Sequence, residues 1–196
     1  MYWPARFLGW LLLRTFFGLR VISAERIPAT GPLVVVANHE SFLDGPVVGA
    51  ALRHRKATFL SAPWLFRVPV VGVFLRSIGS LPAHSGRGEV ATLREAIRIL
   101  ERGGTVVVFP QGGISGSQFY GGAVFLAVKA EAPLLPMRIV GTKEALPLGR
   151  RWPSFFSPVT VRIGTPIAAE DLSPPGSPTG VAVAQGRRLL EELLTL

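Results

Sequence analysis

The 196-residue chain has no cysteine, three histidines, two aspartates and one asparagine. Without cysteine it forms neither disulfides nor thiolate metal sites, and its redox compartment cannot be inferred. The histidines are scattered, which argues against a metal site built from imidazoles. Charged residues are also scarce at 17%, whereas hydrophobic residues reach 48%. A soluble protein normally keeps more charge on its surface, so we expect part of the apolar composition to lie outside the core.

The charge that is present is mainly positive, with 21 Lys and Arg against 12 Asp and Glu and a formal net charge of +9. Such a chain attracts anions, including phospholipid headgroups, nucleic acid phosphates and anionic substrates. Nucleic acid is disfavoured as a partner, because the aromatic residues cluster in apolar runs instead of alternating with basic residues as stacking platforms do. The combination of apolar and basic residues favours a membrane surface.

The first 25 residues combine apolar and aromatic side chains with three arginines. The uncharged stretch from Phe7 to Leu13 is too short to cross a bilayer, which needs about 20 residues. Wound as a helix, the arginines share one sector and leave an apolar face. Residues 1–25 are therefore interpreted as amphipathic helices in a membrane surface, with a helix that covers the protein's own core or a signal peptide as alternatives. The face consists of Phe7, Leu8, Leu11, Leu12, Phe16 and Leu19.

Strand and helix patterns alternate through residues 26–196, with no internal repeat and no linker that marks a second domain. This alternation predicts a single α/β domain with a mixed, mostly parallel twisted sheet flanked by helices. Strands are expected at Leu33–Val36, Thr105–Phe109, Leu134–Val140 and Val159–Ile163, with a short one near Ile78–Leu81. Helices are expected at Pro46–Leu52, 89–102, Gln118–Ala130 and Val181–Leu194, with a loop at Ser173–Gly180.

Two further segments have more than one interpretation. The charge run from Arg53 to Lys56 suits the solvated C-terminal end of a helix, with contact to lipid phosphate as the alternative. The apolar residues between Trp64 and Leu75 are too numerous for a loop. They are interpreted as core, with the lining of an alkyl-chain site as the alternative.

Four polar residues, Asn38, His39, Ser41 and Asp44, follow the buried strand at Leu33–Val36. Imidazole accepts protons near neutral pH, and a carboxylate five residues later can hold its other ring nitrogen. This is the base and orienting group of a catalytic triad without the nucleophile, which the hydroxyl of a substrate would supply. The alternative is structural: Ser41 or Asp44 caps the helix that begins near Pro46, and His39 is packed.

A second turn, Pro110-Gln111-Gly112-Gly113, follows the strand at Thr105–Phe109. Its glycines can expose backbone amides to an anion or oxyanion, or they can simply allow a tight turn with positive φ. In an α/β sheet the turns at the carboxyl ends of strands gather the ligand. We therefore expect the two turns to be neighbours, which favours a catalytic role for His39.

Three motifs resemble, in order and separation, those of the glycerolipid acyltransferase family typified by lysophosphatidate acyltransferase (PlsC type). The resemblance spans about residues 25–170. It implies transfer of a fatty acyl group from acyl-CoA or acyl carrier protein to a lipid hydroxyl, with no cofactor or metal, His39 as general base and Asp44 orienting it. It also implies N-terminal helices in the bilayer surface, hence a membrane-associated protein, expected at the cytoplasmic face. The motifs are Asn38-His39-x-Ser41-x-x-Asp44, Phe109-Pro110-x-Gly112 and Ala132–Pro136.

The chain departs from the family pattern at charged positions. Where the second block of the family has an arginine, this chain has Ser85, with Arg87 two residues later. Where the third block has glutamate, threonine and arginine, this chain has Gln111, Gly113 and Ile114. Arginine binds phosphate with two parallel hydrogen bonds that neither serine nor isoleucine can make. The altered third block supports an alternative function, that of a non-catalytic membrane-surface lipid-binding protein.

Two interpretations of the acceptor follow. Either Arg87, with Arg76, Arg138 or Lys143, contacts a phosphate from a shifted position, or the acceptor is a sugar or another lipid hydroxyl without phosphate there. We favour the second, because the loss of two arginines is hard to compensate. Gln111 fits it as a neutral donor and acceptor for a hydroxyl.

Overall fold

The computed structural model of the chain describes residues 2–83, 87–111, 121–150, 152–172 and 186. For residues 2–6 and 87–89 the description is limited to the backbone. Helices and strands alternate along the described residues, as the sequence predicts. The loop expected at Ser173–Gly180 lies outside the described residues, and so does the helix expected at Val181–Leu194 except for Gly186.

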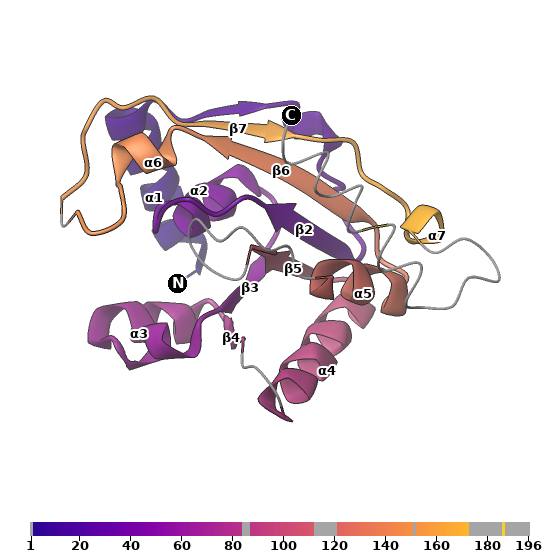
Figure 1. The fold of residues 1–196 in the computed structure, drawn as a ribbon. Coiled ribbons are helices and arrows are strands. Elements are labelled where there is room, and N and C mark those ends of the chain that lie inside the picture. Colours follow the sequence, from indigo (N-terminus) through magenta and orange to yellow (C-terminus); the bar gives the residue numbers. More distant parts are fainter. Residues whose placement is uncertain (1, 84–86, 112–120, 151, 173–185, 187–196) are drawn as a thin grey trace.

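Seven strands of the described residues form one sheet in the order β1-β7-β6-β2-β5-β3-β4 (Figure 1). Five neighbouring strands from β4 to β6 are parallel, β7 is antiparallel to β6, and β1 is parallel to β7. The predicted single α/β domain with a mixed, mostly parallel sheet is therefore confirmed. The strands are β1 (Arg20–Ile22), β2 (Leu33–Ala37), β3 (Ala57–Ser61), β4 (Leu81–Pro82), β5 (Thr105–Val108), β6 (Leu134–Val140) and β7 (Thr160–Ile163).

Helices cover both faces of this sheet (Figure 1). On one face α1 and α2 pack through Leu13, Phe17, Val47 and Val48. On the other face α4, α5 and α7 cover the sheet with their own apolar residues. The helices are α1 (Tyr2–Phe17), α2 (Asp44–Ala51), α3 (Pro69–Ser77), α4 (Arg87–Glu101), α5 (Gly122–Lys129), α6 (Thr142–Ala145) and α7 (Ala169–Leu172), with 3-10 turns η1 (Ala24–Arg26) and η2 (Pro63–Arg67).

The central strand β2 lies between β5 and β6 and is buried at all five positions. Alternate side chains along it point to opposite faces, so Val35 joins the core under α1 and α2, and Val34 joins the core under α4 and α5. A strand that is covered on both faces has no polar side, which explains its uninterrupted apolar sequence. β2 therefore ends at a fixed place in the middle of the carboxyl edge of the parallel strands.

The helix predicted over 89–102 is confirmed as α4, and the glycines after it explain its end. Gly103 has a φ of +76°, a left-handed conformation that glycine adopts without steric penalty. The amide of Gly104 then donates to the carbonyl of Ile99 at 2.9 Å, which closes the last turn of the helix. The chain reverses at once and enters β5 at Thr105.

The N-terminal segment is helical only as far as Phe17. The prediction of helix through residue 25 is wrong beyond that point, because Gly18 turns the chain at a φ of +53° and residues 20–22 pair with β7 as strand β1. The apolar face predicted for the helix is exposed at every position except Leu19, which is 3% exposed. No described helix is long and apolar enough to cross a membrane. The exposed members are Phe7 (63%), Leu8 (55%), Leu11 (43%), Leu12 (46%) and Phe16 (37%).

Residues 57–81 differ more from the predicted secondary structure and burial than the N-terminal segment does. The 3-10 turn η2 and helix α3 occupy this segment, and strand β3 precedes them where the sequence predicted none. The short strand expected near Ile78–Leu81 falls at Leu81–Pro82. The interpretation of the apolar residues between Trp64 and Leu75 as core is wrong for most of them. Trp64 is 53% exposed and Val70 is 82% exposed, whereas Leu75 is buried. α3 therefore places most of its apolar side chains outside the core.

The charge run from Arg53 to Lys56 is not uniformly solvated. Arg55 is only 6% exposed, so the interpretation of the run as a solvated helix end is wrong for this residue. Its Nε donates to Thr105 Oγ1 at 2.7 Å, its Nη1 donates to the carbonyl of Pro28 at 2.7 Å, and its Nη2 donates to the carbonyl of Gly31. Burial lowers the pKa of the guanidinium because water no longer solvates its charge.

Arg55→Ala is expected to lower the free energy of unfolding by about 3 kcal/mol, because Thr105 Oγ1 and the carbonyls of Pro28 and Gly31 lose their donor at once. Urea denaturation measures this difference. His54→Ala, a change at the exposed neighbouring residue, serves as the matched control and is expected to shift stability by less than about 0.5 kcal/mol. Equal midpoints for the two variants would contradict a structural role for Arg55.

Candidate active site

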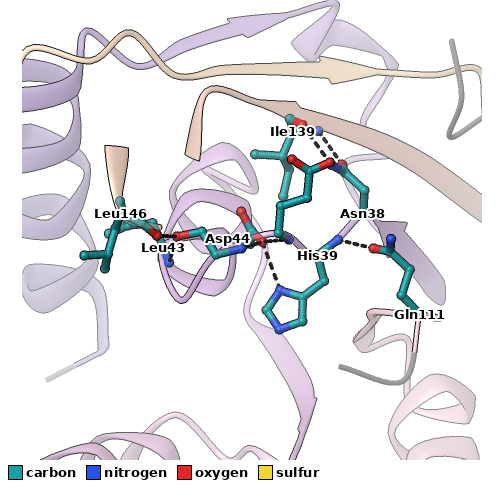
Figure 2. A network of polar contacts seen from close by, with 9 residues as sticks. Asn38, His39, Leu43, Asp44, Gln111, Ile139 and Leu146 are labelled. Carbon is teal, nitrogen blue, oxygen red and sulfur yellow. Dashed lines mark hydrogen bonds and ion pairs between the residues drawn. The ribbon is translucent and has the colours of Figure 1, made fainter. Parts of the chain in front are cut away.

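His39 and Asp44 meet in the turn between β2 and α2 (Figure 2). The distance from His39 Nδ1 to Asp44 Oδ2 is 2.9 Å, and the Asp44 side chain is fully buried whereas 19% of the His39 side chain is exposed. A carboxylate accepts hydrogen bonds, so Nδ1 is the protonated nitrogen of the ring. The lone pair of the neutral imidazole is then on Nε2, on the side of the ring that points away from Asp44 (Figure 2).

The same Asp44 oxygen organises the turn that carries His39. Oδ2 also accepts the backbone amides of Glu40 at 2.7 Å and Ser41 at 2.8 Å. These donors offset the loss of solvation that a buried carboxylate suffers. Asp44 does not cap α2, since it is the first residue of the helix and no side chain caps the N-terminus. The helix-capping role considered for Ser41 or Asp44 is therefore wrong.

Asn38 extends the pairing of β2 with β6 beyond the last strand residue. Its Nδ2 donates to the carbonyl of Ile139 at 2.9 Å, and its Oδ1 accepts the amide of Ile139 at 2.7 Å. The side-chain amide thus takes the place of a backbone peptide group. The residue immediately before His39 is fixed to the sheet, and so is the point at which the turn that carries His39 begins.

Ser41 connects the turn to a segment more than 100 residues away in sequence. Its hydroxyl donates to the carbonyl of Leu146 at 2.8 Å and accepts the amide of Leu43 at 3.2 Å. With both bonds inside the protein and no exposed surface, Ser41 positions the turn. Asn38 is also buried, at 6% exposure, and its side-chain hydrogen bonds likewise position the turn. The substrate-binding role predicted for these two residues stays a prediction, and the contacts described here are positioning contacts within the protein.

The two turns predicted to be neighbours are in contact. The His39 ring stacks on Phe109 with 4.3 Å between ring centroids, and the His39 amide donates to Gln111 Oε1. Pro110, predicted to bind substrate, is buried beside them. This neighbourhood follows from the parallel pairing of β2 with β5, which aligns the two strand ends. Gly112 and Gly113 lie outside the described residues.

The basic residues considered for a phosphate are spread over different elements. Arg87 is the first residue of α4, and its side chain lies outside the described part of the chain. Arg76 in α3 donates to the carbonyl of Phe66 at 2.9 Å. Arg138 is half-buried in β6, and Lys143 is exposed in α6. Among the described residues there is also no group of three or more His, Cys, Asp or Glu able to hold a metal ion.

Sequence reasoning found the contact between His39 and Asp44 but missed the residues that anchor it. Ile139 and Leu146 contribute only backbone groups to the site, which any residue possesses, so neither carries a local signal. The stacking of Phe109 on His39 was equally hidden in an apolar strand end. The one available signal was the prediction that strand ends gather together.

The chain is similar in sequence to several known proteins. A 1-acyl-sn-glycerol-3-phosphate acyltransferase of Brassica napus is 28% identical over 159 residues, which cover 78% of this chain and 46% of that protein. An uncharacterized protein of Mycobacterium tuberculosis is 32% identical over 154 residues, which cover 69% of this chain and 40% of that protein. The chain thus spans less than half the length of these curated relatives.

A solved structure extends the similarity to nearly the whole chain. The crystal structure of the 1-acyl-sn-glycerophosphate acyltransferase PlsC from Thermotoga maritima superposes with a TM-score of 0.73 at 28% identity, covering 99% of this chain and 77% of that one. The family model described as Acyltransferase matches residues 18–140, which include β2, the His39–Asp44 turn and β5. With more than half of its residues matched, this chain belongs to the acyltransferase family.

Proposed function

We propose that this protein is an O-acyltransferase that moves a fatty acyl group from an acyl thioester to a hydroxyl of a lipid acceptor. The observation that carries the proposal is the His39–Asp44 pair, with Nδ1 held at 2.9 Å by a buried carboxylate and the ring partly exposed. A base held in this way has one nitrogen committed to the protein and the other available to a substrate.

In the proposed reaction His39 Nε2 takes the proton of the acceptor hydroxyl as its oxygen attacks the thioester carbonyl. The tetrahedral intermediate then expels the thiolate, which receives the proton from the imidazolium, and the ester is released with the free thiol. Asp44 holds the ring in the tautomer that leaves Nε2 unprotonated and stabilises the imidazolium between the two steps. The donor is acyl-CoA or an acyl carrier protein, and no metal or cofactor takes part.

Two observations point to different acceptors. The relatives from Brassica napus and Thermotoga maritima are named as acyltransferases of 1-acyl-sn-glycerol-3-phosphate, which favours a glycerolipid. The third motif of this chain instead carries Gln111, which is neutral and uses its Oε1 to hold the His39 amide. We propose that the acceptor is a lipid hydroxyl and that this lipid carries no phosphate near the reacting hydroxyl.

The proposed reaction takes place at a membrane surface. α1 exposes five large apolar side chains on a chain of net charge +9, which favours a helix lying at the level of anionic headgroups. Its opposite side is part of the core through Leu13 and Phe17. α1 therefore combines two of the three interpretations that the sequence left open, core cover and membrane contact, on two different faces.

Replacement of His39 by alanine is expected to lower acyl transfer by about 10² to 10⁴-fold, because the acceptor hydroxyl loses its base. Transfer of a labelled palmitoyl group from palmitoyl-CoA to acceptors in vesicles measures the effect, with far-UV circular dichroism to verify the fold. His54→Ala removes an exposed histidine in another turn and is expected to retain full activity. Retained turnover in His39→Ala would refute the assignment of the base.

The acceptor is tested by offering lysophosphatidate and an unphosphorylated glycolipid to the wild-type protein in parallel. The glycolipid is expected to be acylated at least about tenfold faster, measured as kcat/KM. A preference for lysophosphatidate would show that phosphate recognition survives through other residues. Absence of turnover with both acceptors and with both donor classes would favour the alternative of a non-catalytic lipid-binding protein.

A further inference from the structure

A loop of residues 146–157 lies between α6 and β7 and is referred to below as the aromatic loop. It places three large aromatic side chains in solvent: Trp152 is 73% exposed, Phe155 is 53% exposed and Phe156 is 79% exposed. Leu148 adds a further apolar side chain at 51% exposure. Such a concentration of apolar surface on one loop indicates a contact surface.

Internal hydrogen bonds hold the aromatic loop in shape. The amide of Ser154 donates to the carbonyl of Ala145 at 2.7 Å, and Arg150 Nη1 donates to Ser154 Oγ at 2.7 Å. Phe156 has a φ of +65°, which is unfavourable for a residue with a Cβ atom, and its amide donates to the carbonyl of Phe16 at 2.6 Å. The backbone is thus fixed in an unfavourable conformation that leaves the Phe156 ring outside.

The aromatic loop continues the exposed face of α1. The Phe155 ring lies 5.3 Å from the Phe16 ring and 6.1 Å from the Phe17 ring, measured between centroids. Phe16 belongs to the apolar face of α1, whereas Phe17 is buried. One apolar surface therefore runs from α1 onto the loop, although the two segments are about 140 residues apart in sequence.

The charges of both segments have one sign. No acidic residue occurs between Glu144 and Glu170, and the aromatic loop carries Arg150 and Arg151. The chain before Glu25 likewise contains arginines and no acidic residue. Aromatic rings combined with arginine suit the headgroup region of a bilayer that contains anionic lipid, where tryptophan and basic side chains both find favourable contacts.

The aromatic loop also begins beside the candidate active site. The carbonyl of Leu146 accepts the hydroxyl of Ser41, which lies two residues after His39. Figure 1 shows α6 and the segment after it at the same edge of the sheet as the end of β2 and α3. A membrane that touches the loop is therefore at the edge of the sheet that carries the catalytic turn.

We propose that the aromatic loop is a second membrane-binding element, which inserts Trp152, Phe155 and Phe156 into the headgroup region of an anionic bilayer beside α1. Two attachment points restrict the tilt of the domain over the membrane more than α1 alone does. The loop thereby turns the His39 edge toward the lipid. The orientation matters for catalysis, and in this respect the inference rests on the proposed function. The membrane contact itself does not depend on turnover.

The test is flotation of the full chain with vesicles of phosphatidylcholine containing roughly one third phosphatidylglycerol. The variant Trp152→Ser/Phe156→Asn removes two exposed rings, and asparagine tolerates the positive φ at position 156. Phe155 is left unchanged because it packs on Phe17. The partition coefficient is expected to fall about tenfold or more.

The matched control is Ile22→Ser/Val90→Ser, which removes two apolar side chains that are 46% and 50% exposed on β1 and α4. Its partition coefficient is expected to stay within about twofold of wild type, and thermal melting followed by circular dichroism verifies the fold of both variants. The fluorescence of Trp152 is obtained as the difference between the wild-type protein and the variant Trp152→Phe. Brominated phospholipid in the vesicles is expected to quench this difference signal.

Unchanged flotation of the loop variant would overturn the inference. So would a dimer in solution that the loop variant abolishes while vesicle binding persists, because the rings would then cover a second copy of the chain. The assay contains no acyl donor or acceptor, so its result is independent of the proposed function. Vesicle binding through the loop without any acyl transfer would overturn the proposed function alone.

Discussion

One oxygen atom, Asp44 Oδ2, gathers three N–H groups from three consecutive residues: the ring of His39 and the amides of Glu40 and Ser41. Because the chain must curl around the carboxylate to bring these donors together, the interaction fixes the shape of the turn as well as the direction of the imidazole. A buried carboxylate without such donors would carry a large desolvation penalty. The shape of the turn and the His39–Asp44 contact therefore depend on the same carboxylate oxygen.

That turn keeps its place because the sheet holds it from outside. β2 is buried along its whole length between β5 and β6, and Asn38 continues its pairing with β6 by one more step. Phe109, directly after β5, stacks on the face of the His39 ring, and the carbonyl of Leu146 accepts the hydroxyl of Ser41. The position of a proton-accepting nitrogen is thus set by strands and loops that contribute no reacting group.

The parts that could be predicted from the sequence are those with a local cause. Runs of β-branched residues predicted β2 and β5, an apolar run predicted β6, and the spacing from His39 to Asp44 predicted their pairing. β1 and β3 escaped prediction because neither contains a run of β-branched residues, and both are stabilised by partners far along the chain, residues 159–162 and β5. Arg55 looked like any surface cation, since its acceptors Pro28 and Gly31 become neighbours only in the fold.

The buried guanidinium of Arg55 ties the loop that enters β2 to the first residue of β5, at the amino ends of the two strands whose carboxyl ends carry the candidate site. Arg55 thus helps to fix the register of β2 against β5 at the end of the strands opposite to the candidate site. Changes in the turns at the carboxyl ends therefore leave this link between the two strands intact.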